Sequence, residues 1–136
     1  MKQLLAIAII LTVSGCSTTF VPPESAKQVP AERIFYQGDG DAKITVTRDD
    51  GYIGGGCYLA LLINGAKAAQ FDPEEKATFN VASGATILGV TFSGDGLCSY
   101  GQVLSTETQL KPGEHGIYRM YTGYSSDPVI LPVSKS

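Results

Sequence analysis

Short runs of apolar and β-branched residues, separated by glycine, proline and aspartate, make up most of this 136-residue chain. Residues 43–47 alternate polar and apolar side chains, a pattern that predicts a strand with one buried face. Residues 57–63 and 86–92 are apolar on both faces, as expected for central strands. Further strands are predicted at residues 33–37, 66–71, 77–81, 99–110, 116–121 and 129–131, the last between Pro128 and Pro132 as an edge strand.

The breaks between these runs have the chemistry of turns. Asn64-Gly65 joins two predicted strands, and both residue types tolerate the positive φ of a type I′ hairpin turn. No segment after residue 16 has the periodicity of a helix. Short strands at this spacing predict an all-β domain, an antiparallel sandwich or small barrel of about eight strands. The pattern alone does not separate the sandwich from the barrel.

The first sixteen residues differ from the rest. Lys2 is followed by an unbroken apolar run at residues 4–11 and then by Val13-Ser14-Gly15-Cys16. This is the layout of a secretory signal, and its last four residues resemble the lipobox of bacterial lipoproteins. The resemblance implies that residues 1–15 are a signal peptide, and that Cys16 is lipidated and acylated, with palmitate as one such chain. An ordinary secreted protein cleaved nearby, or a short membrane helix, is the alternative.

The residue that follows Cys16 indicates the membrane to which the protein is sorted. In enterobacterial lipoproteins a serine at this position, here Ser17, implies the outer membrane. Residues 16–31 are polar and contain three prolines, so we expect a lipidated N-terminus and a flexible tether that lifts the domain at residues 32–136 off the bilayer. We expect this domain in the periplasm, although the sequence does not exclude the cell surface.

The lipobox also affects how many cysteines are available to form a disulfide. With Cys16 assigned to lipid, Cys57 and Cys98 remain as a pair, and the oxidising envelope favours a disulfide between them. Two free thiols, or half of a metal site, are the alternative.

Composition excludes some classes of partner. Without the leader, the chain has a net charge of about −4, and no basic footprint for nucleic acid is present. No polybasic segment lies beside Cys16 to add membrane affinity. We therefore expect the lipid anchor to be the contact with the membrane and nucleic acid not to be a partner.

Signatures of catalysis are missing from the sequence. His115 is the single histidine, in a segment that reads as a loop, and neither a nucleophile elbow, a P-loop nor an H-E-x-x-H motif is present. We predict no catalytic residue, no cofactor and no metal. A loose calcium site is the one open alternative, with candidate ligands Asp39, Asp41, Asp49 and Asp50.

Two features indicate binding. A disulfide between Cys57 and Cys98 would bring two glycine-rich loops to one end of the domain, and loops on a rigid sandwich often carry binding sites. The candidate loop residues are Gly54, Gly55, Gly56, Gly94, Asp95 and Gly96. The second feature is Arg119 with Tyr118, Tyr121 and Tyr124, residue types enriched in interfaces, although core tyrosines explain them equally well.

The turn chemistry of residues 62–65, 71–73 and 78–84 resembles that of small β-sandwich lipoproteins of bacteria. This resemblance brings no catalytic set with it. We predict an outer-membrane lipoprotein that is not an enzyme and that acts as a binding or scaffolding module for another envelope protein. A small-ligand binder for lipid, glycan or metal is the alternative, followed by a hydrolase with an unrecognised site.

Overall fold

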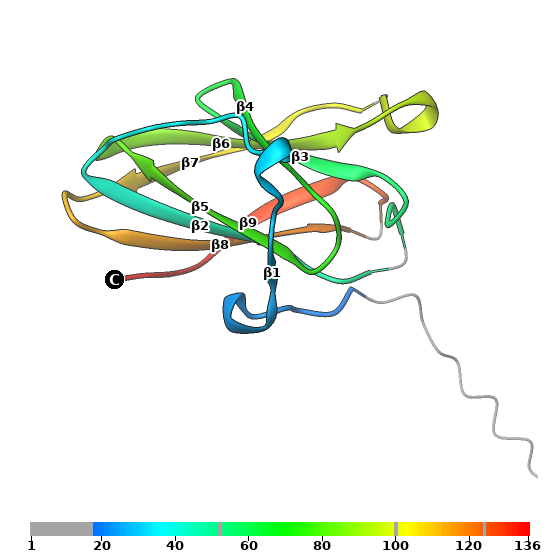
Figure 1. Cartoon of the computed structure of the whole chain (residues 1–136), viewed down its shortest axis with the longest axis horizontal. Helices are drawn as coiled ribbons and strands as arrows, with labels where there is room; N and C mark the ends of the chain where they lie inside the picture. Colours follow the sequence, from blue (N-terminus) through cyan, green and yellow to red (C-terminus); the bar gives the residue numbers. More distant parts are fainter. Residues whose placement is uncertain (1–17, 52, 100, 124) are drawn as a thin grey trace, which may run out of the picture.

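Two β-sheets packed face to face form the domain in the computed structural model, which describes residues 18–51, 53–99, 101–123 and 125–136 (Figure 1). One sheet has the strand order β1-β5-β2-β8-β9 and the other β4-β3-β6-β7. The strands are β1 (Lys27–Gln28), β2 (Ala42–Arg48), β3 (Tyr58–Ile63), β4 (Ala66–Phe71), β5 (Glu75–Val81), β6 (Gly84–Ser93), β7 (Leu104–Leu110), β8 (His115–Thr122) and β9 (Pro128–Lys135). The predicted sandwich is thus confirmed.

Three 3₁₀ turns complete the described chain: η1 (Pro23–Ser25), η2 (Ala31–Arg33) and η3 (Gly96–Ser99). Within the described residues no helix has the length and apolar character needed to cross a bilayer.

The hairpin between β3 and β4 follows the predicted turn. Asn64 has φ 49° and Gly65 has φ 83°, the left-handed pair that a type I′ turn requires. β3 and β6 pair with each other and lie inside their sheet, as their two-sided apolar sequences predicted. β9 lies at the edge of its sheet, again as predicted, but extends from residue 128 to 135.

The core fills the space between the sheets. Its largest fully buried side chains come from both sheets and include Phe71, Leu59, Leu61, Ile44 and Tyr118. β2 is the exception to simple alternation, because Thr45 and Thr47 on its other face are buried as well. The prediction of a half-buried strand at residues 43–47 is therefore wrong in this respect: β2 lies between β5 and β8, and the N-terminal segment covers part of its outer face.

That covering segment corrects a second prediction. In the described part of residues 16–31 the chain is not a flexible tether, because residues 18–34, here called the strap, lie against the five-stranded sheet (Figure 1). Within the strap, β1 adds to β5 in parallel, and Val21 and Val29 are buried. Three prolines suggested a linker, but the same residues supply extended backbone that follows a sheet without needing every N–H.

The end of the strap and the residues that follow it run along the edge of the other sheet. Residues 33–37 do not form the predicted strand: the chain makes the turn η2 and then a single bridge between Ile34 and Ala69. The N–H groups of Phe35 and Tyr36 both donate to the carbonyl of Ala68. This segment therefore caps the exposed edge of β4, which would otherwise present unpaired backbone groups.

Candidate functional site

Long-range hydrogen bonds hold the strap in place. The N–H of Val21 donates to Asp49 Oδ1 at 3.1 Å, and Lys76 Nζ donates to the carbonyl of Pro23 at 2.6 Å. Further along, Arg33 forms two hydrogen bonds with the Glu75 carboxylate, at 2.7 and 2.8 Å. Hydrogen bonding to Glu75 raises the pKa of Arg33, against the opposing effect of burial. These contacts make the strap one wall of a groove.

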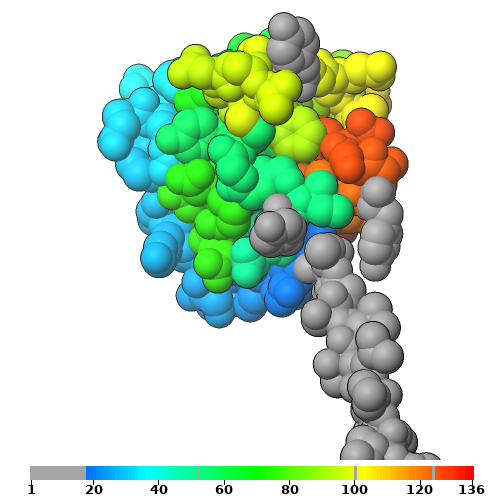
Figure 2. All heavy atoms as spheres, turned by 90° about the vertical axis from the view of Figure 1, so that its right-hand side faces the viewer, coloured from blue at the N-terminus to red at the C-terminus, as the bar shows by residue number. Residues whose placement is uncertain are grey.

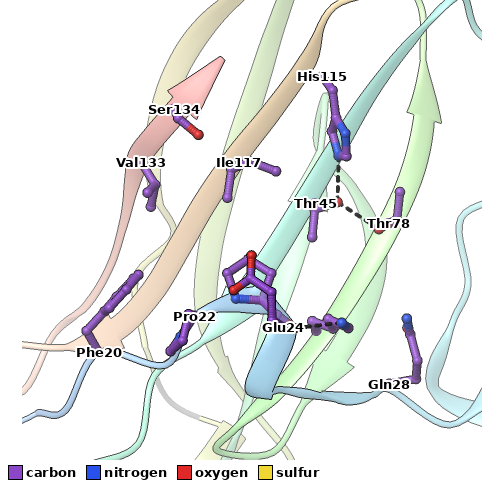
Figure 3. Close-up of a pocket in the computed structure, with 12 residues that line it drawn as sticks. Phe20, Pro22, Glu24, Gln28, Thr45, Thr78, His115, Ile117, Val133 and Ser134 are labelled. Atoms are coloured by element: carbon purple, nitrogen blue, oxygen red, sulfur yellow. Dashed lines mark hydrogen bonds between the residues drawn. The ribbon is translucent and has the colours of Figure 1, made fainter. Parts of the chain in front are cut away.

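The groove lies on the outer face of the five-stranded sheet and encloses about 500 Å³ (Figure 3). Phe20 and Pro22 of the strap form one side, and Ile117 and Val133 provide apolar surface from β8 and β9. The remaining lining residues are Pro23, Glu24, Gln28, Thr45, Lys76, Thr78, His115 and Ser134. A volume of this size, with a mostly apolar lining and a few polar groups, is typical of small-molecule and peptide sites.

A chain of hydrogen bonds forms part of the groove floor. His115 Nε2 and Thr45 Oγ1 lie 2.7 Å apart, and Thr45 Oγ1 lies 2.7 Å from Thr78 Oγ1 (Figure 3). His115 is the first residue of β8 and not a loop residue, so this sequence interpretation is wrong. The turn at Gly113, with φ 77°, is completed before it, and the imidazole lines the groove because His115 and Ile117 share one face of β8.

An imidazole beside a hydroxyl is the pairing that activates a nucleophile. Here the hydroxyl belongs to Thr45, which is buried and already shared with Thr78. Among the described residues, no carboxylate hydrogen-bonds to His115 to orient it. The arrangement offers an imidazole and two hydroxyl groups as polar contacts to a ligand in the groove.

An arginine–aromatic cluster adjoins the groove. The Arg119 guanidinium lies 5.0 Å from the ring centroid of Phe20 and 4.8 Å from that of Tyr121. It also pairs with Asp49, with Nε 2.7 Å from Oδ2. Leu131 lies opposite Arg119 in the register of β8 and β9, and its side chain is exposed.

Asp49 links this cluster to the strap. Its buried carboxylate accepts hydrogen bonds from the Val21 N–H and from Arg119. Burial raises the pKa of Asp49, while the hydrogen bonds from Val21 and Arg119 and the positive charge of Arg119 oppose that rise. The Arg119 charge is thereby balanced at the surface, leaving the flat face of its guanidinium to the aromatic rings.

The predicted glycine loops lie elsewhere. The disulfide between Cys57 and Cys98, whose Cα atoms are 5.4 Å apart, is present as predicted. It joins the loop carrying Gly54, Gly55 and Gly56 to the loop carrying Gly94, Asp95 and Gly96 at one end of the sandwich. Gly54 is also a structural residue, because its carbonyl accepts a hydrogen bond from the buried side chain of Arg48.

The buried side chain of Arg48 stabilises the end of the sandwich that carries the disulfide. Its guanidinium donates to the carbonyls of Gly54, Cys57 and Phe71, and it has no direct carboxylate partner in the described residues. Burial lowers the pKa of Arg48 to about 10. The side chain thus ties the first glycine loop to the end of β4 by charge-assisted hydrogen bonds.

The remaining predicted residues have other surroundings. Cys16 and Tyr124 lie outside the described residues, while Tyr118 is buried and donates or accepts a hydrogen bond with Thr108. Asp41 accepts hydrogen bonds from Ser83, which lower its pKa. In the described part of the chain, no three His, Cys, Asp or Glu side chains gather as metal ligands.

Comparison of the chain with protein-family models, with curated proteins and with solved structures found no match.

Most of the groove was not predicted from the sequence. Phe20 falls in the segment predicted to be a tether, and Leu131 and Val133 lie in or next to a predicted edge strand. A local signal is present in β9, where Val129, Leu131 and Val133 are apolar on the face that carries Arg119. The partner surface from the strap has no such signal, because Phe20 is a single aromatic residue in a short segment without the alternation of a strand.

Proposed function

We propose that this protein is a lipid-anchored, non-enzymatic binding module of the bacterial cell envelope and that its partner is another envelope protein. The proposed contact surface, called the binding face, consists of Phe20, Ile117, Arg119, Tyr121, Leu131 and Val133. It combines the apolar side of the groove with the arginine–aromatic cluster.

The observation that carries this proposal is the exposure of large apolar side chains on the binding face. Of the eight large hydrophobic residues exposed in the described chain, Phe20, Leu131 and Val133 lie here, with exposures of 44%, 40% and 46%. Phe20 and Val133 line one groove, and Phe20 stacks on Arg119. Clustered apolar exposure of this kind marks interaction surfaces on soluble domains.

The residue types favour a protein partner. Arginine and tyrosine are enriched among interface residues that contribute most to binding. Asp49 already balances the charge of Arg119, so a partner can cover the guanidinium without leaving an unpaired charge. β9 is an edge strand that borders the same face, and the edge of a sheet can accept an added strand.

The anchoring part of the proposal is supported by the sequence. The lipobox resemblance at Val13-Ser14-Gly15-Cys16 implies export and lipidation, and a Cys57–Cys98 disulfide is consistent with an oxidising compartment. Outer-membrane location and a periplasmic domain belong to the same proposal, on the strength of Ser17.

Site-specific photocrosslinking in intact cells tests the binding face. A benzophenone amino acid replaces Leu131 in one variant and Ile87 in another, which is a matched control because Ile87 is 47% exposed but lies on the other sheet. We expect one discrete crosslinked protein from position 131 and none from position 87. Equal crosslinking at both positions, or none at 131 in correctly folded protein, contradicts the assignment of this face.

The groove supports a second function, the binding of a small ligand. Its volume of about 500 Å³ and the hydroxyls and imidazole on its floor suit a molecule with an apolar body and one polar group. Native mass spectrometry of the membrane-extracted protein would then show a bound mass. Because Ile117 lines the groove, Ile117→Glu should remove that mass while the core stays intact; no bound mass in the wild type counts against this function.

A further inference from the structure

The strap fixes the point at which the chain enters the domain. Thr18 Oγ1 donates to the carbonyl of Thr122 at 3.2 Å, and Thr19 and Asp50 exchange backbone hydrogen bonds of 2.7 and 3.1 Å. Cys16 precedes Thr18 by only two residues. Since consecutive Cα atoms are 3.8 Å apart, the Cα of Cys16 lies within about 8 Å of the Cα of Thr18 in any conformation.

Thr18 lies at one particular end of the sandwich, here called the anchor end. β2, β6 and β8 finish there, and the described residues beyond them form the loops at 49–51, 53–57, 94–99 and 125–127. The disulfide joins two of these loops, and Thr122, the partner of Thr18, is the last residue of β8. Figure 2 faces this end: η3 lies toward the top and the blue start of the strap toward the bottom.

The anchor end carries an unusually exposed apolar residue. Leu97 in η3 is 90% exposed, the highest value among the exposed large hydrophobic residues of the described chain. Its neighbour Cys98 is bonded to Cys57, so the turn that presents Leu97 is covalently tied to the residue before β3. A leucine held outward at the end nearest the lipidation site is placed to enter the headgroup region of a bilayer.

Exposed acidic side chains lie at both ends of the sandwich. Asp50, Asp95 and Asp127 are exposed at the anchor end. Residues of both signs are exposed at the opposite end, where Lys43, Lys111 and Asp41 lie beside the turn that precedes β8. Attraction of basic residues to anionic lipids therefore does not favour the anchor end, and the acyl chains with Leu97 would have to supply its attachment.

We propose that the lipid anchor holds the disulfide-bonded anchor end directly against the bilayer, with Leu97 inserted at the membrane interface. This inference rests on the proposed lipidation of Cys16. It replaces the long spacer predicted from residues 16–31 with a link of two residues. Because β8 and β9 run between the anchor end and the opposite end, the part of the groove formed by His115 and Ser134 faces the aqueous compartment.

The chain contains no tryptophan, so a single introduced tryptophan reports its own surroundings. We would prepare Leu97→Trp and, as the matched control, Ile87→Trp, which is exposed next to the Asn64 turn at the other end. Each full-length lipidated protein is reconstituted into phosphatidylcholine vesicles with brominated acyl chains. Mass spectrometry, circular dichroism and a thiol assay establish lipidation, folding and the intact disulfide.

We expect bromine to quench the tryptophan of the Leu97→Trp protein, whose emission shifts to the blue on vesicle binding, and to leave that of the Ile87→Trp protein unquenched. Lipidated, vesicle-bound protein with no quenching at position 97, or with equal quenching at both positions, overturns the proposed orientation but leaves the anchor itself standing. Protein that carries no lipid by mass and stays off the vesicles overturns both. Iodide in solution supplies the complementary readout, because it should quench the tryptophan at position 87 more strongly than the one at position 97.

Discussion

Removal of the disulfide should lower the free energy of unfolding of the domain by an amount that depends on the length of the loop it closes. Cys57 and Cys98 are separated by 41 residues and join positions next to paired strands β3 and β6. In the chain-entropy model a closed loop of this length restricts the unfolded state by about 4 kcal/mol at 25 °C. The distance of 5.4 Å between the Cα atoms is ordinary for a disulfide, so the folded state should not offset that gain.

The test compares the Cys16→Ala protein with the same protein carrying Cys57→Ser and Cys98→Ser. Urea unfolding at equilibrium, followed by circular dichroism, should show a free energy of unfolding about 4 kcal/mol lower in the serine variant. This is a large part of the roughly 5–15 kcal/mol that stabilises most domains. Because the core residues stay in place, the folded spectrum should be retained. A loss below about 1 kcal/mol would refute the argument from loop closure.

Two further predictions concern the glycine loop and the carboxylate beneath the strap. Gly54 has φ +72°, and an added Cβ would lie 2.7 Å from the Phe92 ring, so Gly54→Ala should cost about 2 kcal/mol or more in urea unfolding. A Cβ added at Gly56 would have no atom within 4 Å, so the free energy of unfolding of Gly56→Ala should stay within about 0.5 kcal/mol of wild type. Equal losses of stability in the two variants would contradict this explanation. Burial raises the pKa of Asp49 above its ordinary 3.8, so the folded state binds its proton more tightly than the unfolded chain. Its contribution to stability should therefore be greatest below pH 3.8 and be lost as the pH rises through the raised pKa. Asp49→Asn should remove this part of the pH dependence, and a wild-type advantage that instead grows with pH would show that the pairing with Arg119 outweighs burial.

The strands could be predicted where the signal is local. Asn64-Gly65 specified a hairpin because both residues accept positive φ, and β3 and β6 showed their central place through apolar residues on both faces. The lateral order of the strands had no comparable signal. The parallel pairing of β2 with β8 joins residues far apart in the sequence, such as Lys43 and His115, and depends on the whole fold.

The strap could not be recognised because its partners are distant in the sequence. Arg33 pairs with Glu75 and Val21 with Asp49, and neither contact leaves a periodic pattern in residues 18–34. Prolines in this segment gave the compositional signature of a linker. Phe20 lies in this segment, so one wall of the groove could not be predicted either.

The disulfide, unlike the strap, could be predicted from the sequence. A count of three cysteines, together with the lipobox resemblance of Cys16, was enough to pair Cys57 with Cys98, because only two cysteines remained. The pairing follows from cysteine chemistry and the oxidising compartment, without knowledge of the fold. The glycine loops joined by the disulfide follow from it, whereas the binding face arises from side chains that only the folded sheet brings together.

The most direct test of the proposed anchored binding module is chemical crosslinking in intact cells, with purification and mass spectrometry of what is captured. Wild type is compared with Cys16→Ala, which lacks the proposed anchor, and with Leu131→Ser, which alters the binding face. We predict one envelope protein captured by the wild type and lost from both variants, while both variants stay folded. Undiminished capture by Leu131→Ser would contradict the binding face. No captured protein from folded, anchored wild type would contradict the module and favour a small ligand in the groove.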